Sequence, residues 1–172
     1  ANTALMGRWQ TIAEAPLTVC DTGHNAHGIA YVAEQIRATP HKELYCVIGF
    51  VRDKDLAHIL PLLPHEAHYI FTQAHSERSL PAAELTAKAA IYGLHGEAVE
   101  EVTAAVARAR ELASEGDMIF IGGSTYVVGR RLACSGVRMM RLLTRAFCTP
   151  GRTVAKSMMN SEVECDMIAR LE

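Results

Sequence analysis

The sequence lacks the patterns that mark several large classes of protein. No apolar run approaches the roughly 18 residues that a membrane-spanning helix needs, so we expect no contact with a membrane. The patterns C-x-x-C and H-E-x-x-H are absent and the eight histidines are scattered, so we expect no metal site. The pattern G-x-x-x-x-G-K-[ST] is also absent, which excludes a P-loop from this chain.

The chain has no large excess of charge of either sign. Its 17 Lys and Arg residues face 19 Asp and Glu residues, which gives a formal net charge of −2. A general nucleic-acid-binding protein needs a basic face, so we expect no nucleic-acid partner, although a local basic pocket for one small anion stays open. With 172 residues, 49% of them hydrophobic, the chain is long enough for one folded domain, or one domain and an appendage.

No secretory leader is visible, and the five cysteines are odd in number and irregularly spaced. Cys20 and Cys46 lie inside apolar runs, where a reduced cysteine behaves as a small hydrophobic residue. We therefore expect a reducing, cytoplasmic location. The chain begins at Ala1 without a methionine, which suggests a piece of a longer protein.

Short apolar runs alternate with segments of helical periodicity. The runs predict strands at Leu17–Cys20, 44–50, 69–72 and 118–121, with a weaker strand near 94–99. Apolar spacing predicts helices at Ala26–Ala38, 56–63, after Pro81 and at 102–113. Gly116 is expected to end the last helix as its C′ residue.

This alternation predicts an α/β fold with a mostly parallel sheet in three layers. Ligands of such sheets bind beyond the carboxyl ends of the strands. Four polar loops follow predicted strands and are expected to converge there: residues 21–25, 52–55, 73–78 and 123–126. The pattern changes after Leu132, so we place a domain at 1–133 and an extension at 134–172, with partial helical periodicity and an open role.

Three residues at this edge are candidates for binding a nucleotide and an anionic substrate. Asp21 can accept hydrogen bonds from the two hydroxyls of a ribose, or either it or Asn25 can cap the following helix. Arg8 can hold a phosphate by charge-assisted hydrogen bonds, or be an ordinary surface arginine. His24 is a candidate site residue or a plain loop histidine.

Two further segments carry polar groups that suit an anion. Residues 122–126, with Ser124 at their centre, offer backbone N–H groups and a hydroxyl, or form a tight turn into a helix. Residues 52–55 are a charged site loop or, as we favour, a capped start of the next helix. A nucleophilic Cys20 is disfavoured because its apolar strand would suppress the thiolate.

Five motifs in order resemble the C-terminal domain of folylpolyglutamate synthase, including its bifunctional form with dihydrofolate synthase, within the Mur ligase superfamily. The resemblance covers roughly residues 5–132. Its motifs are Gly7-Arg8-Trp9-Gln10, Asp21-Thr22-Gly23-His24-Asn25-Ala26, Val47-Ile48-Gly49-Phe50 with Asp53-Lys54-Asp55, Leu80-Pro81-Ala82-Ala83-Glu84-Leu85, and Gly123-Ser124-Thr125-Tyr126-Val127-Val128-Gly129. Thr22-Gly23 replaces the usual Gly-Ala, Ala26 replaces the usual Pro, and Gln10 replaces a common acid.

The resemblance implies a Rossmann-like domain that closes over a central ATPase domain. ATP would phosphorylate the carboxylate of a folate or of dihydropteroate, and the amine of glutamate would then attack the acyl phosphate. Arg8 would contact the ATP phosphates, Asp21 the ribose, and His24 and Ser124 the incoming glutamate, with His24 also catalytic. The P-loop and the Mg²⁺ ligands would lie in the central domain, so this chain alone is expected to be inactive.

Two other interpretations stay open. One is the equivalent domain of a peptidoglycan-building Mur ligase, although the Asp53-Lys54-Asp55 loop and the Gly-Ser-x-Tyr segment favour the folate branch. The other is a non-catalytic nucleotide-binding or protein-interaction module that has the same fold. Loss of ligand affinity in Asp21→Ala and Arg8→Ala would favour a ligase over such a module.

Overall fold

The computed structural model describes residues 8–124 and 127–128, so the predicted extension at 134–172 and its boundary lie outside the described residues. The strands are β1 Gln10–Glu14, β2 Leu17–Cys20, β3 Leu44–Ile48, β4 His68–Gln73, β5 Gly96–Glu101 and β6 Met118–Gly122. The helices are α1 Ala26–Ala38, α2 Leu56–Ile59 with the 3₁₀ turn η1 Leu60–Leu62, α3 Ala82–Ala90 and α4 Val102–Leu112. None of the helices in this part of the chain is long and apolar enough to cross a membrane.

The six strands form one sheet in the order β1-β2-β6-β3-β4-β5. All neighbouring strands are parallel except β1 and β2, which pair antiparallel at one edge. The last strand of the described residues, β6, therefore lies between β2 and β3, in the middle of the sheet. The α/β class with a mostly parallel sheet is confirmed.

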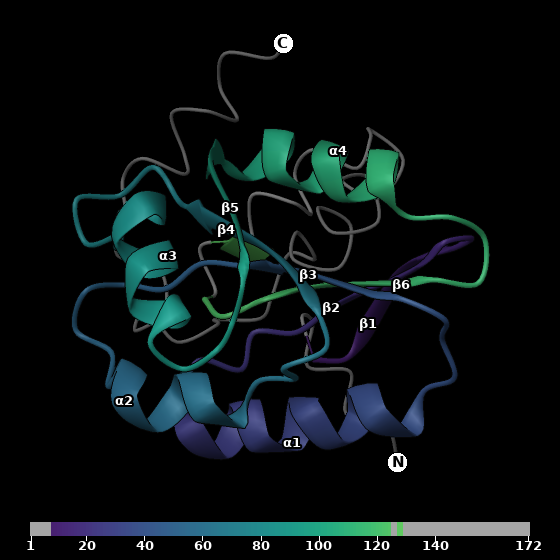
Figure 1. Ribbon diagram of the computed structural model, residues 1–172, viewed down its shortest axis with the longest axis horizontal. Coiled ribbons are helices and arrows are strands. Elements are labelled where there is room, and N and C mark those ends of the chain that lie inside the picture. The colour runs from purple at the N-terminus through teal and green to yellow at the C-terminus, as the bar shows by residue number, and fades with distance from the viewer. Residues whose placement is uncertain (1–7, 125–126, 129–172) are drawn as a thin grey trace, which may run out of the picture. The chain divides into compact units, whose positions relative to one another are not determined.

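Helices cover both faces of the sheet, with α1 and α2 along one side and α4 on the other (Figure 1). Side chains alternate between the two faces along each central strand, as strand geometry requires. In β4, Tyr69 and Phe71 pack in the cluster that contains the apolar faces of α1 and α3, and Ile70 packs in the cluster that contains α4. Because both faces are covered, β6 is buried at all of its residues.

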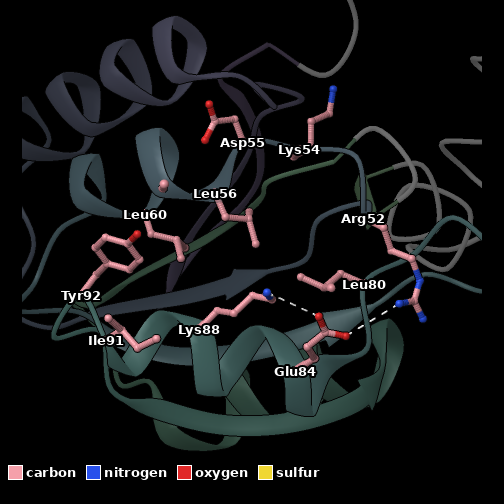
Figure 2. Close-up of a pocket in the computed structure, with 11 residues that line it drawn as sticks. Arg52, Lys54, Asp55, Leu56, Leu60, Leu80, Glu84, Lys88, Ile91 and Tyr92 are labelled. Atoms are coloured by element: carbon pink, nitrogen blue, oxygen red, sulfur yellow. Dashed lines mark ion pairs between the residues drawn. The ribbon is translucent and has the colours of Figure 1, made fainter.

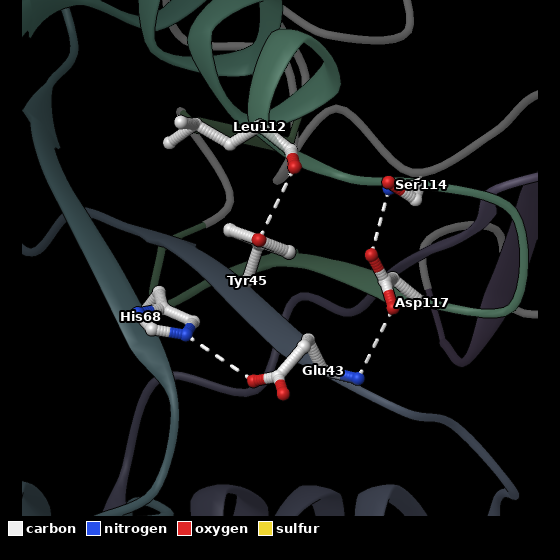
Figure 3. A network of polar contacts seen from close by, with 6 residues as sticks. All are labelled: Glu43, Tyr45, His68, Leu112, Ser114 and Asp117. Atoms are coloured by element: carbon white, nitrogen blue, oxygen red, sulfur yellow. Dashed lines mark hydrogen bonds and ion pairs between the residues drawn. The ribbon is translucent and has the colours of Figure 1, made fainter.

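Asp117 links two backbone segments at the amino-terminal edge of the sheet (Figure 3). Its carboxylate, only 6% exposed, accepts hydrogen bonds from the backbone N–H of Ser114 at 2.7 Å and of Glu43 at 3.2 Å. The Tyr45 hydroxyl donates to the carbonyl of Leu112 at 3.2 Å. Burial, with the nearby charges of Asp117 and Glu43, raises the pKa of Tyr45. These contacts fasten the end of α4 to β3 on the edge opposite the expected ligand site.

Several details differ from the sequence predictions, among them the bounds of β5, which is Gly96–Glu101 and not 94–99, and of α2, which ends at Ile59. The strand β1 was not expected, because its residues are half-buried or exposed and show no strong alternation. The third strand ends at Ile48, not at Phe50. Gly116 is not the C′ residue of the last helix: α4 ends at Leu112 with Ala113 as its C-cap, and Gly116 adopts a φ of 95° in the turn that follows.

Two glycines permit close backbone approach at the carboxyl end of the sheet. A Cβ on Gly49 would lie 2.6 Å from the carbonyl oxygen of Thr72. Gly123 has a φ of 92°, and a Cβ there would lie 2.7 Å from the carbonyl oxygen of Gly49. The loops after β3 and β6 therefore pack backbone against backbone, which leaves no room for a side chain between them.

Comparison of Gly123→Ala with Gly116→Ala tests this close packing. Both glycines have a left-handed backbone, which costs an L-residue about 1–2 kcal/mol. A Cβ at Gly116 would contact only the flexible side chain of Lys42, whereas one at Gly123 would clash with backbone. We expect Gly123→Ala to lower the free energy of unfolding, measured with urea, by about 1 kcal/mol or more beyond Gly116→Ala. Equal losses would contradict the tight approach.

Candidate functional site

The candidate site lies at the carboxyl edge of the central strands. Cys20 of β2 pairs with Ile121 of β6, and Ile48 of β3 pairs with Gly122. Beyond the ladder, the N–H of Asp21 donates to the carbonyl of Ile121 at 3.1 Å. The register therefore brings the loop at residues 21–25 next to residues 122–124, as the parallel order of the strands predicted.

Asp21 is buried at the base of this edge, with 2% of its surface exposed. One carboxylate oxygen, Oδ1, accepts the N–H of Gly23 at 2.6 Å. The other, Oδ2, accepts the N–H of Trp9 at 2.7 Å. Asp21 does not cap the following helix; it joins the loop after β2 to the segment before β1.

Arg8 is exposed and directly precedes Trp9, whose N–H is bound to Asp21. The guanidinium of Arg8 makes no ion pair with any described residue. Trp9 has a φ of 42°, and its half-buried ring stacks on Phe120 of β6 with centroids 6.4 Å apart. Trp9 belongs to the first of the five motifs and is the single tryptophan of the chain, but the sequence alone indicated no role for it.

His24 and Asn25 form the exposed tip of the same loop. The Nδ1 atom of His24 lies 2.9 Å from the carbonyl oxygen of Thr22. Because a carbonyl oxygen only accepts, Nδ1 carries the proton in this contact, and Nε2 of the neutral ring is an acceptor. Asn25 is the N-cap of α1, where its side-chain oxygen accepts the N–H of Gly28 at 2.8 Å. Of the two residues considered for this cap, Asn25 provides it.

Ser124 ends the loop after β6 and is 5% exposed. Its carbonyl accepts the N–H of Val127 at 3.1 Å and of Val128 at 3.2 Å, so a helical turn begins there. These bonds show a helical turn that starts from the carbonyl of Ser124, and Ser124 itself lies at the same edge of the sheet as Asp21. Residues 125 and 126 lie outside the described residues.

The side chains of the charged loop after β3 make ion pairs. Asp55 is the N-cap residue of α2 but makes no side-chain capping bond; its carboxylate contacts Nδ1 of His58 at 2.7 Å. Asp55 therefore stands at the start of the helix as expected, but it makes no side-chain capping bond and the first turn of α2 contains no acid. Asp53 binds Arg78 from the loop after β4 at 2.8 Å, and this hydrogen bond lowers the pKa of Asp53.

An open groove lies between α2 and α3, next to the charged loop (Figure 2). It has a volume of about 570 Å³, and sequence reasoning did not anticipate it. Its lining combines apolar side chains such as Leu56 and Leu80 with a charged rim. On that rim Glu84 lies 3.6 Å from Lys88 and 3.7 Å from Arg52, as Figure 2 shows. Exposed pairs of this kind contribute little to stability.

In the described ranges, no three His, Cys, Asp or Glu side chains are grouped in a way that could hold a metal ion. Cys20 is fully buried in β2 and Cys46 is fully buried in β3. Burial raises the pKa of the Cys46 thiol well above its ordinary value. Neither sulfur is exposed to a substrate at the carboxyl edge.

The chain has a mostly parallel α/β sheet with polar loops at its carboxyl edge, which is where open sheets of this class bind their ligands. The family model for the Mur ligase glutamate ligase domain matches residues 7–125. The chain therefore belongs to the family of Mur ligase glutamate ligase domains.

The relatives of the chain are larger proteins. A probable bifunctional folylpolyglutamate synthase/dihydropteroate synthase of Haloferax volcanii is 32% identical over 125 residues, which are 71% of this chain and 15% of that protein. One similar solved structure is a crystal structure of the bifunctional folylpolyglutamate synthase/dihydrofolate synthase of Yersinia pestis with AMPPNP and Mn ion. The match has a TM-score of 0.68 and 25% identity, and it covers 75% of this chain and 31% of that one. A structure of such an enzyme with Mn, AMPPNP and L-glutamate matches with the same score, identity and coverage.

Replacement of Asn25 tests the loop that presents His24. Asn25→Ala removes the capping oxygen of α1, so we expect the free energy of unfolding to fall by about 1 kcal/mol in urea titrations. Asn25→Ser is the control, because a serine hydroxyl can accept the same N–H. Unchanged stability in Asn25→Ala would show that the loop is held without this bond.

Proposed function

We propose that this chain is the glutamate ligase domain of an ATP-dependent ligase of the folylpolyglutamate synthase type. The observation that carries the proposal is the gathering of Arg8, Asp21, His24 and Ser124 at one edge of the sheet, in a domain of this family. The similar solved enzymes were crystallised with AMPPNP, Mn and, in one case, L-glutamate. The proposed substrates are therefore ATP, glutamate and a folate or dihydropteroate.

In the proposed reaction, ATP phosphorylates the terminal carboxylate of the folate or dihydropteroate, which gives an acyl phosphate and ADP. The amine of glutamate attacks the acyl carbon, the carbon–oxygen bond to phosphate breaks, and an amide and phosphate are released. The amine loses a proton during this attack. Positive charge and hydrogen-bond donors held in place would stabilise the charge that develops.

The described residues are suited to these roles. The exposed Arg8 guanidinium is available to ATP phosphates. The Nε2 acceptor of His24 is available to the ammonium group of glutamate, whose site Ser124 would help to line. Asp21 has lone pairs left for a ribose hydroxyl after its two backbone contacts, although its burial restricts the approach.

The remaining parts of the proposal lie outside this chain. We infer that a separate ATPase domain of the same protein supplies the P-loop and the Mg²⁺ ligands, since the sequence has no P-loop. A cytoplasmic location completes the proposal, and the buried free thiol of Cys46 supports it.

The test measures glutamate-dependent phosphate release with tetrahydrofolate or dihydropteroate as the acceptor. We expect no release from this chain alone and release when it is joined to its ATPase domain. Glutamate-dependent ATP hydrolysis by the chain alone would contradict the proposed division of labour. No turnover with either acceptor, in a well-folded joined protein, would favour the peptidoglycan ligase or the non-catalytic module.

Substitutions in the joined protein test the roles of the site residues. Arg8→Ala is expected to lower kcat/KM by about 100-fold, because a charged donor to developing phosphate charge is lost. His24→Ala is expected to raise KM for glutamate more than KM for ATP. Arg108→Ala is the control, since Arg108 lies on α4 and pairs with Glu97 and Glu111. Equal activity in Arg8→Ala and Arg108→Ala would exclude the phosphate role.

A further inference from the structure

The two hydrogen bonds accepted by Asp21 join segments that are separate in sequence. Gly23 lies two residues after Asp21, whereas Trp9 precedes it by 12 residues. Both bonds are short, at 2.6 and 2.7 Å, as expected for a charged acceptor. With 2% of its surface exposed, Asp21 makes these bonds away from bulk water, where they are stronger.

The conformation of Trp9 shows that its position is determined by its surroundings. A φ of 42° is disfavoured for an aromatic residue and persists only where surrounding contacts enforce it. Two contacts do so: the bond to Asp21 Oδ2 and the stacking of the indole on Phe120. Release of the first contact would free the backbone of Trp9 and, with it, Arg8.

The loop that carries Gly23 and His24 is also close-packed against Asp21. Gly23 is buried, and a Cβ on it would lie 3.0 Å from Oδ1 of Asp21 and 3.3 Å from the backbone of Gly28 in α1. The carboxylate, Gly23 and the first turn of α1 therefore fix the loop on which His24 is exposed. Arg8 directly precedes Trp9, and His24 directly follows Gly23. The N–H groups of Trp9 and Gly23 are both bound to the carboxylate of Asp21.

We propose that Asp21 is a positioning residue that couples the nucleotide side of the site, at Arg8, to the amino-acid side, at His24. This inference rests on the proposed function for the identity of the two ligands. The coupling itself depends only on the two hydrogen bonds. It is compatible with a ribose contact, because a carboxylate has about four lone-pair sites and the backbone uses two of them.

The kinetic test compares the effects of Asp21→Asn on two substrates in the joined protein. An asparagine keeps one acceptor oxygen, which is neutral and therefore weaker, and replaces the other with a donor, so one of the two bonds is lost and the other is weakened. If Asp21 couples the two sides, Asp21→Asn raises KM for both ATP and glutamate. A rise in KM for ATP alone would show a ribose contact only and would overturn the coupling.

A spectroscopic test needs no enzymatic activity, because Trp9 is the single tryptophan of this chain. In Asp21→Asn we expect a red shift of the tryptophan emission and stronger quenching by acrylamide. Asp117→Asn is a matched control: Asp117 is also a buried carboxylate that accepts two backbone N–H groups, but at the opposite edge of the sheet. It is expected to leave the Trp9 emission and quenching unchanged.

The unsubstituted chain provides a measurement that survives a failure of Asp21→Asn to fold. Amide protons bound to a buried carboxylate exchange slowly with solvent, so we expect protection at Trp9 and Gly23 in hydrogen-exchange NMR. Free exchange at both amides would overturn the proposal. The unsubstituted joined protein could lack ligase activity while Asp21→Asn still gives the expected change in Trp9 fluorescence. That combination would refute the proposed function and support the link made by Asp21.

Discussion

The position of β6 in the middle of the sheet is the constraint on which the rest of the structure depends. β6 is the last strand of the described chain, yet it pairs with β2 on one side and with β3 on the other. Its carboxyl end therefore delivers residues 122–124 between the loops that follow β2 and β3. Without this insertion Asp21 and Ser124 would not meet at one edge, and the close approach of Gly123 to Gly49 would not exist.

The sequence predicted the regular elements well wherever apolar periodicity determines them. The predicted bounds of β2 and α1 agree with the structure residue by residue, because both have apolar patterns that burial requires. β1 was missed because an edge strand that pairs on one side needs no such pattern. The end of α4 was misplaced because the carboxylate of Asp117, which accepts the N–H of Ser114, fixes the turn to β6. Gly116 merely follows in that turn.

The candidate site could be predicted in its residue types but not in its contacts. Polar residues after predicted parallel strands indicated the edge, and the structure brings Asp21 and Ser124 there. The bond from Trp9 to Asp21 could not be predicted, because it depends on how β1 and β2 pair and on a left-handed residue. The contact of Asp55 with His58 is local, three residues apart, but helix-cap preferences do not predict whether an N-cap carboxylate bonds to the helix backbone or to a side chain.

The placement of β6 also has a consequence for the order in which the chain can fold. Leu17 in β2 pairs in parallel with Met118 in β6, a separation of about 100 residues, and such distant contacts form slowly because a large loop must close first. During synthesis β2 leaves the ribosome early but acquires its parallel partner only when β6 follows. Until then, the apolar edges of β2 and β3 are exposed to other chains. Synthesis of this domain thus includes an interval in which it is vulnerable to aggregation, and that interval ends when the central strand is inserted.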